Sequence, residues 1–499
     1  MKKNFIHIIL LVGVGSLFLT SCKKDKEPVT PEDPQIIINK YVNTWIKEEM
    51  ESYYLWNNKI PSSLDNKVSP DAYFNSMLYS YDKNLAPDGD RFSWIQEDYT
   101  DLLGMLSGVT TLELGFEYNL FLYNEKDIFG EFAYIKKNTD AAARGLKRGQ
   151  AFTHINNTKL TTDNYRTLLS DASQAASVAL RVYDPTIDLD KKIIYFDNEQ
   201  NIAINLLSKY AENPVYLDSV YTVNGKNIGY LVYNFFAADA NDYTNSYDLA
   251  LNSVFEKFKN KGVDNLVLDL RYNSGGSVLS AIYLSSMIVK NLNTGNVFCK
   301  MEYNPDYQKY IVGKYGQDYL LDYFEKTIEV YSKDGKLTSE HPLHNIGNLQ
   351  TLYVLTGKWT ASASEMIING LQPYMNVYLI GGQTIGKNVA STTFYKANDS
   401  KNKWGLQPII AKFYNSLGKS DFTAGFIPDI LDEDSWNMPK KQLGEIDEAL
   451  LGAAIACITG ETKSQAPSTR SMQSVSFVRE VGSTLNTKPW GNQIIIDNR

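Results

Sequence analysis

Two short motifs carry a serine and a lysine whose types and order suit acyl-transfer chemistry. Ser362 lies in the stretch 357–365 (GKWTASASE), between an apolar strand-like run and a helical run. Lys387 ends the stretch 381–387 (GGQTIGK), which follows the next strand-like run. A serine hydroxyl becomes a nucleophile when a base removes its proton, and a lysine serves as that base once burial leaves its amine neutral. The two motifs therefore predict a Ser-Lys pair in place of a Ser-His-Asp triad.

A third motif, 269–276 (DLRYNSGG), is a candidate source of oxyanion donors. Gly275 and Gly276 follow an apolar strand-like run, and paired glycines let backbone N–H groups approach a substrate closely. We expect one donor from these glycines and a second from the N–H of Ala363, next to the nucleophile. A plain turn is the alternative interpretation of the two glycines.

Each candidate also has a structural interpretation. Ser362 could be only a helix N-cap, because serine is favoured there. Ser364 is a competing nucleophile, and Lys387 could be a solvated loop lysine. Asp269 and Arg271 are better explained as a structural pair at a strand end than as catalytic groups.

Alternating strands and helices would position these motifs. Strand-like runs that alternate with helical runs predict a largely parallel sheet covered by helices, with all three motifs at the same sheet edge. The expected strands are 228–233, 266–271, 352–355 and 377–380, and the expected helices are 247–259, 277–290 and 361–371.

Together these motifs resemble peptidase family S41, the C-terminal processing or tail-specific peptidases. The resemblance covers about 108–435 and includes a late GFIPD stretch at 425–429. It implies a ClpP/crotonase-like α/β core, with Ser362 as nucleophile and Lys387, 25 residues later, as base. The family often carries a glutamine four residues after the lysine. That position is Ser391 here, so Ser391 is a candidate support for the lysine.

A PDZ-like, β-rich domain, inserted in or preceding the core, is expected at 108–190. A strand-like stretch at 111–118 precedes 141–150 (AAARGLKRGQ), which resembles PDZ sequences, and the strand-like 152–156. In such domains a loop of backbone N–H groups holds a peptide carboxylate while the peptide extends the sheet edge. The candidate loop residues are Leu114, Gly115 and Phe116. A PDZ-shaped domain that only packs internally is the alternative.

The chain begins with a pattern typical of export. Two lysines precede the apolar run 5–19, which is shorter than the roughly 20 residues of a membrane span. The run ends in Leu-Thr-Ser-Cys, which resembles a bacterial lipobox, so Cys22 is the expected lipidation site. A plain cleaved leader is the alternative. The expected divisions are 1–22 signal peptide, 23–35 tether, 36–105 helical N-terminal domain, 108–190 PDZ-like domain, 220–435 peptidase domain and 436–499 C-terminal helix and tail.

Composition narrows the function further. The net charge of −8 and the lack of a long Lys/Arg cluster argue against a nucleic-acid partner. No CxxC pair is present, and the HxxH formed by His341 and His344 is better explained as a turn than as a metal site. We therefore expect no metal and no other cofactor.

The predicted function is a lipid-anchored serine endopeptidase of the cell envelope, facing the periplasm or the outside. Its partners would be polypeptide substrates, whose C-termini the PDZ-like domain recognises, and the membrane that holds the lipid at Cys22. Two rivals remain open. One is a catalytically weak or inactive peptide-binding lipoprotein on the same fold. The other is a hydrolase of small esters or other polymers, although no GxSxG elbow occurs.

Overall fold

The protein is described from a computed structural model that covers residues 32–432, 438–461, 477–487 and 493–495. Of residue 487 and of 493–495 only the backbone is described. The predicted signal peptide, the lipidation site Cys22 and most of the tether lie outside these ranges. Within them, none of the helices is long and apolar enough to cross a bilayer.

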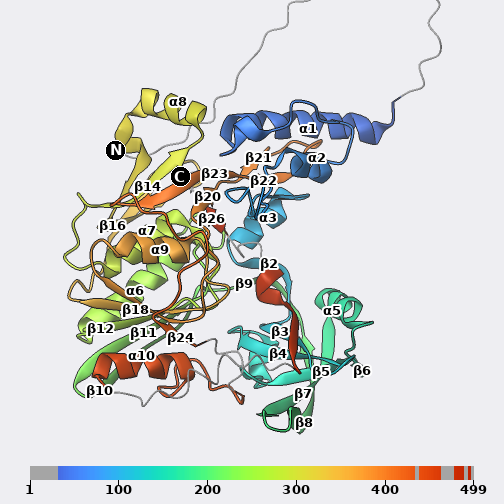
Figure 1. Ribbon diagram of the computed structural model, residues 1–499, viewed down its shortest axis with the longest axis vertical. Helices are drawn as coiled ribbons and strands as arrows, with labels where there is room; N and C mark the ends of the chain where they lie inside the picture. Colours follow the sequence, from blue (N-terminus) through green and yellow to red (C-terminus); the bar gives the residue numbers. More distant parts are fainter. Residues whose placement is uncertain (1–31, 433–437, 462–476, 488–492, 496–499) are drawn as a thin grey trace, which may run out of the picture.

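The core is a six-stranded sheet that runs parallel except at one edge (Figure 1). Neighbouring strands follow the order β10-β11-β12-β18-β19-β24, and only β10 pairs antiparallel. The expected α/β fold is confirmed. These strands are β10 (Val215–Val223), β11 (Lys226–Tyr233), β12 (Asn265–Asp269), β18 (Thr351–Thr356), β19 (Asn376–Gly381) and β24 (Ile430–Leu431).

Helices cover both faces of this sheet because its strands carry apolar side chains on both sides. Helices α6 (Ser246–Asn260), α7 (Val278–Ile288) and α9 (Ala363–Leu371) share the larger apolar core with one face. Helix α10 (Ala449–Thr459) packs on the other face, beside Tyr230, Val267 and Ile380. The nucleophile motif thus ends directly in a fully buried helix, α9.

A second six-stranded sheet lies beside the core, in the order β13-β26-β20-β23-β14-β15. His341 lies in a strand of the neighbouring hairpin, β16–β17, and not in the turn that the sequence predicted. The elements are β13 (Gly275–Ser277), β26 (Gln493–Ile495), β20 (Val389–Ser391), β23 (Ile409–Asn415), β14 (Val297–Tyr303), α8 (Pro305–Tyr315), η2 (Gln317–Leu320), β15 (Leu321–Tyr323), β16 (Thr327–Tyr331) and β17 (Leu337–Pro342).

The β-rich part between the N-terminal helices and the core has its own apolar core and the sheet order β25-β3-β4-β5-β7-β8. The predicted strand 111–118 is interrupted at Leu114 and Gly115, where Gly115 has φ +95°. Its elements are β2 (Val109–Glu113), β3 (Phe116–Leu122), β4 (Ile128–Ile135), α4 (Asp140–Ala143), β5 (Ala151–Ile155), β6 (Thr158–Lys159), α5 (Tyr165–Gln174), β7 (Ser177–Asp188), β8 (Ile193–Asn205), β9 (Leu207–Ala211) and β25 (Arg479–Ser483).

The N-terminal helices α1 and α2 pack against strands β21 and β22 (Figure 1). A short three-stranded sheet, β1-β22-β21, joins the N-terminal segment to the later chain, with Trp94 opposite Gln407. The remaining elements are α1 (Pro34–Tyr53), η1 (Asn57–Lys59), α2 (Pro70–Met77), β1 (Trp94–Gln96), α3 (Tyr99–Leu106), β21 (Phe394–Tyr395), β22 (Gly405–Gln407) and α12 (Thr484–Thr487).

Candidate active site

The three predicted motifs meet at the carboxyl edge of β12, β18 and β19. Neighbouring parallel strands end at the same edge, so the loops that follow them lie side by side. Direct contacts join the loops, because Ala361 N–H donates to Asn273 O (3.2 Å) and Ile385 N–H donates to Thr360 O (3.0 Å). The structure therefore brings together the serine, lysine and glycine motifs.

Ser362 sits at the N-terminus of α9 in a backbone conformation that few residues other than glycine adopt. Its φ is 65° and its ψ is −118°, and the side chain is fully buried. Such strain is stored mainly where function requires it. Its Oγ makes no hydrogen bond to any described residue, including Lys387. The hydroxyl is thus held in place by the backbone and remains available to a reacting partner.

Ser364, the competing nucleophile, has a different environment. Its Oγ donates to Asn273 O at 3.0 Å, in the glycine-containing loop. A hydroxyl engaged by a buried carbonyl is costly to withdraw. The contrast favours Ser362 as the reactive hydroxyl and gives Ser364 a structural role.

Glu365 joins the serine motif to the lysine motif, a role that the sequence did not reveal. One carboxylate oxygen accepts from Thr384 Oγ1 (2.6 Å) and Gly386 N–H (2.7 Å). The other accepts from the N–H groups of Ser362 (2.9 Å) and Lys387 (2.7 Å). Burial raises the pKa of Glu365, and these four donors oppose that shift. One side chain therefore fixes the backbone of both candidate catalytic residues.

Lys387 is fully buried, and its Nζ lies 5.0 Å from the ring centroid of Phe92. Burial lowers the pKa of Lys387 well below its usual value; Asp90 and Glu365 oppose the shift, and the charge of Arg91 adds to it. Desolvation penalises the ammonium and favours the neutral amine. The environment suits a general base.

The segment 90–93 brings the N-terminal helical part of the chain to this lysine. Arg91 Nη2 donates to Gly386 O (2.7 Å) and Thr423 O (3.1 Å). Asp90 is fixed by Tyr54 Oη, which donates to its carboxylate at 2.9 Å. The N-terminal segment therefore forms one wall around Lys387, which no local sequence pattern indicated.

Ser391, the candidate support for Lys387, is fully buried on β20. Gln407, also fully buried, donates from Nε2 to Ser391 Oγ at 3.1 Å. Thr393 Oγ1 donates to Gln407 Oε1 at 2.7 Å and fixes the orientation of the amide. A glutamine is thus present beside position 391, although it comes from β22.

The predicted oxyanion donors differ in their present use. Gly275 N–H already donates to Asn273 Oδ1 (2.8 Å), so it is not available in this state. Gly276 has φ +136°, and a Cβ there would lie 2.0 Å from Phe236 O, so only glycine fits. Ala363 is the first residue of α9, where an N–H has no intrahelical acceptor. Ala363 and Gly276 therefore remain the better-placed candidates.

Asp269 and Arg271 form a buried structural cluster, as their positions at the strand end indicated. Arg271 Nε donates to Asp269 Oδ1 (3.0 Å), and both Arg271 Nη atoms bind the Glu448 carboxylate at 2.6 and 3.0 Å. Glu448 caps α10, because its carboxylate accepts from Leu451 N–H. The cluster thus fastens α10 to the end of β12.

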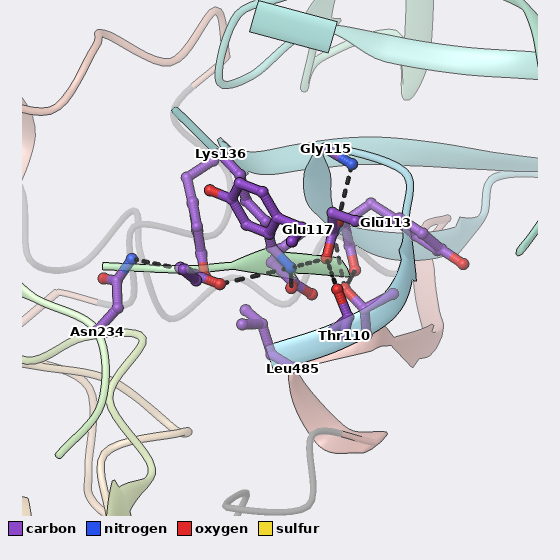
Figure 2. A network of polar contacts seen from close by, with 12 residues as sticks. Thr110, Glu113, Gly115, Glu117, Lys136, Asn234 and Leu485 are labelled. Carbon is purple, nitrogen blue, oxygen red and sulfur yellow. Dashed lines mark hydrogen bonds and ion pairs between the residues drawn. The ribbon is translucent and has the colours of Figure 1, made fainter. Parts of the chain in front are cut away.

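The candidate PDZ loop is already occupied by the protein itself (Figure 2). Gly115 N–H donates to Glu113 Oε1 at 2.8 Å. The same carboxylate bonds Lys136 Nζ (2.7 Å), which also pairs with Glu117 (2.9 Å) and Glu212 (3.4 Å). An internal carboxylate therefore already bonds one N–H, that of Gly115, in the loop predicted to hold the C-terminus of a peptide.

Comparison with known families gives this site a context. The family model described as peptidase family S41 matches residues 227–431, and the model described as the peptidase S41 N-terminal domain matches residues 41–94. The chain belongs to peptidase family S41. The first match contains all three motifs, and the second ends with the segment that contacts Lys387.

Relatives within S41 are distant. The chain is 26% identical over 225 residues to a carboxyl-terminal-processing protease of Picosynechococcus, and 26% identical over 213 residues to a tail-specific protease of Haemophilus influenzae. These matches cover 44% and 42% of this chain, but only 42% and 25% of those proteins. The chain thus matches less than half the length of either protein.

A solved structure matches over most of the chain. It is described as that of an S41 protease from Bacteroides fragilis, with a TM-score of 0.64 and 25% identity. The similarity covers 83% of this chain and 97% of that one. The S41 fold therefore extends beyond the core to the surrounding parts of the chain.

Three residues beside the candidate site, Glu365, Gln407 and Arg91, were not predicted from the sequence. Glu365 stood inside the nucleophile motif, and its spacing of three residues after Ser362 was a capping-box signal. Gln407 and Arg91 had no comparable signal, because their contacts depend on how separate elements pack. Within the described ranges, no three His, Cys, Asp or Glu side chains group as a metal site would require.

Proposed function

We propose that the chain is a serine endopeptidase that hydrolyses polypeptides with Ser362 and Lys387 through an acyl-enzyme. The observation that carries the proposal is the buried Ser362 Oγ, which has no hydrogen-bond partner among the described residues and projects from a strained backbone at a helix N-terminus. A nearby lysine with a lowered pKa supplies the base. Polypeptide is the proposed substrate because the two relatives described above are named as proteases.

In the proposed reaction, neutral Lys387 takes the proton of Ser362 Oγ as the hydroxyl oxygen attacks the peptide carbonyl. The protonated lysine then gives that proton to the leaving amine, and an acyl-enzyme remains. Lys387 then takes a proton from a water molecule whose oxygen attacks the ester carbonyl, and it returns this proton to Ser362 Oγ as the bond between the acyl carbon and Oγ breaks and the carboxylic acid leaves. The Ala363 N–H and the glycine loop would stabilise the oxyanion, helped by the α9 dipole.

Two further roles belong to the proposal. Ser391 and Gln407 together would orient Lys387, replacing the single glutamine that S41 members often carry. The PDZ-like domain would assist by holding the C-terminal part of a substrate. The contact between Gly115 and Glu113 favours recognition through the strand edge of β3 over recognition of the carboxylate.

The test compares two serines of one motif. Ser362→Ala should abolish cleavage of an unfolded protein such as casein, whereas Ser364→Ala should keep most of it, because its hydroxyl only bonds Asn273 O. Equal activity in Ser362→Ala and the unaltered chain would refute the proposal. An unaltered chain that fails both to cleave and to react with a fluorophosphonate probe would favour the rival, an inactive peptide-binding lipoprotein.

We also propose that Cys22 carries a lipid that anchors the enzyme to a membrane of the cell envelope. The support is the leader that ends at this cysteine. Cys22→Ala should move the protein from the membrane fraction to the soluble fraction of the producing cell. An unchanged distribution would contradict the anchor and leave the peptidase proposal untouched.

A further inference from the structure

The C-terminal part of the chain lies on the sheet edge predicted to receive a peptide. β25 pairs antiparallel with β3, the strand that directly follows the candidate PDZ loop. Glu480 lies opposite Phe121, and Ser483 lies opposite Asn119. Without β25, β3 would be an edge strand of the order β25-β3-β4-β5-β7-β8. An extended segment added antiparallel to this edge is how such domains bind peptides.

Residues of β25 and of the segment that follows it contact the nucleophile motif. Trp359 Nε1 donates to Asn486 Oδ1 at 2.9 Å, and Lys358 pairs with Glu480. Leu485 is buried among Tyr134 and Tyr272, and it lies beside the Lys136 cluster in Figure 2. Residues 480–486 therefore connect the PDZ-like domain to the loop that precedes Ser362.

Further along, the backbone of β26 enters the sheet beside the candidate active site. It pairs parallel with β13, where Gly276 lies opposite Ile494. Its other side faces β20, where Ser391 lies opposite Ile495. Figure 1 shows β26 at this place, next to β20. The strand therefore lies between the glycine loop and the residue that supports Lys387.

This position is the one an extended substrate would need. A polypeptide that reaches Ser362 between the glycine loop and β20 can bond its backbone to the strands on both sides, as β26 does. Backbone pairing is independent of side chains, so it accepts many sequences. Two described strands of the C-terminal part of the chain, β25 and β26, thus cover the edge of β3 and the edge of β13.

We propose that β25 and β26 are internal, substrate-like ligands that occupy the edges of β3 and β13 and compete in cis with polypeptide substrates. The proposal rests on the proposed function, because it names the binding mode of that same site. Substrate binds only to molecules whose tail is displaced. If nine molecules in ten hold the tail in place, the apparent KM rises roughly tenfold, while kcat at saturation is unchanged.

The first experiment removes β26 and leaves β25 in place. A chain truncated after Asn492 should cleave casein with a KM roughly tenfold lower and the same kcat. Ile494→Pro in the full chain should act in the same direction, because proline cannot donate to the ladder. Ile494→Val keeps the N–H and serves as the matched control. Unchanged KM values in both the truncated chain and Ile494→Pro would overturn the proposal.

The second experiment does not depend on cleavage, so it separates this proposal from the peptidase proposal. A fluorescent peptide of residues 491–499 should bind the truncated chain carrying Ser362→Ala, and at least about tenfold more weakly to the full chain carrying Ser362→Ala. The same peptide with proline at 494 should not bind. Equal binding to the two chains, or no binding to either, would overturn the proposal even if casein is cleaved.

Mass spectrometry of the purified chain tests whether the C-terminal tail is itself cleaved. We expect the full chain to keep residues 493–495 after incubation. A cut within this segment that Ser362→Ala prevents would overturn the inhibitory role, because the tail would then be a substrate.

Discussion

Two loops of this molecule were predicted to meet the substrate, and their polar groups are satisfied to different degrees. Around Ser362, four donors converge on Glu365, and yet the Ser362 hydroxyl itself has no partner among the described residues. In the PDZ-like loop, Gly115 N–H donates to the Glu113 carboxylate. Leaving a buried polar group without a partner is costly. The fold therefore leaves a buried polar group without a described partner at Ser362, whereas it supplies a partner at Gly115.

The largest effect should come from Lys387, the proposed base for this hydroxyl. Lys387→Met keeps a similar volume in the buried site but removes the base, so kcat should fall by about 10³-fold or more. Lys358→Met, at an exposed lysine of the neighbouring motif, should keep kcat within a few-fold. Steady-state cleavage of casein measures both. Comparable losses of kcat in Lys387→Met and Lys358→Met would contradict the assignment of Lys387 as the base.

Glu365→Gln should have the next largest effect, because it disturbs the group that bonds the backbone of both proposed catalytic residues. The amide oxygen can still accept from two of the four donors. The NH₂ group faces the other two donors, which therefore lose their acceptor. We expect kcat to fall about 10²-fold and the free energy of unfolding to fall by about 2 kcal/mol or more. Activity and urea denaturation are both needed. A stability loss without a loss of kcat would make Glu365 purely structural.

Gln407→Leu tests whether the support of Lys387 has moved to another strand. The change removes the amide that bonds Ser391 Oγ and accepts from Thr393. We expect about a tenfold loss of kcat with little change in KM, because a misoriented base weakens proton transfer and not substrate binding. Thr393→Val removes only the hydrogen bond from Thr393 to Gln407, so it should lower kcat by a smaller factor. A raised KM with unchanged kcat would contradict the positioning role.

The wall formed by residues 90–93 predicts pH shifts of opposite sign. The pKa of Lys387 is lowered, so kcat/KM should rise with pH as its ammonium loses the proton. Arg91→Gln removes a charge that lowers this pKa and should move the rise to higher pH. Asp90→Asn removes a charge that raises it and should move the rise to lower pH. Arg91→Lys keeps the charge and is the control.

The same lowered pKa makes stability depend on pH. Between the pKa of Lys387 in the folded state and its ordinary value, the unfolded chain binds more protons, so the free energy of unfolding rises with pH across this window. Lys387→Met should flatten this rise in the free energy of unfolding.

The kinetic prediction has its own contradicting outcome. If the kcat/KM profiles of Arg91→Gln and Asp90→Asn shift in the same direction, the charges of these two residues do not control the pKa of Lys387.

The sequence was sufficient to predict those parts of the candidate site that follow consecutive βαβ units. Ser362, Lys387 and the glycine loop follow neighbouring parallel strands, so periodicity and topology placed them together. It failed where contacts join segments distant in the chain. Nothing local in Arg91 or Gln407 indicated a neighbour almost 300 residues away or on another strand. The tail could not be placed either, because strand pairing leaves little mark on sequence.

Glu113→Gln, in the PDZ-like loop, should have the smallest effect on catalysis and gives the other half of the comparison. Its carboxylate bonds Gly115 N–H and Lys136, but two further glutamates remain beside that lysine. We expect a loss of about 1 kcal/mol in urea unfolding and less than a twofold change in kcat/KM. A gain in cleavage of substrates with a free C-terminus, absent for amidated ones, would contradict this assignment, because it would mean that Glu113 blocks a working carboxylate site.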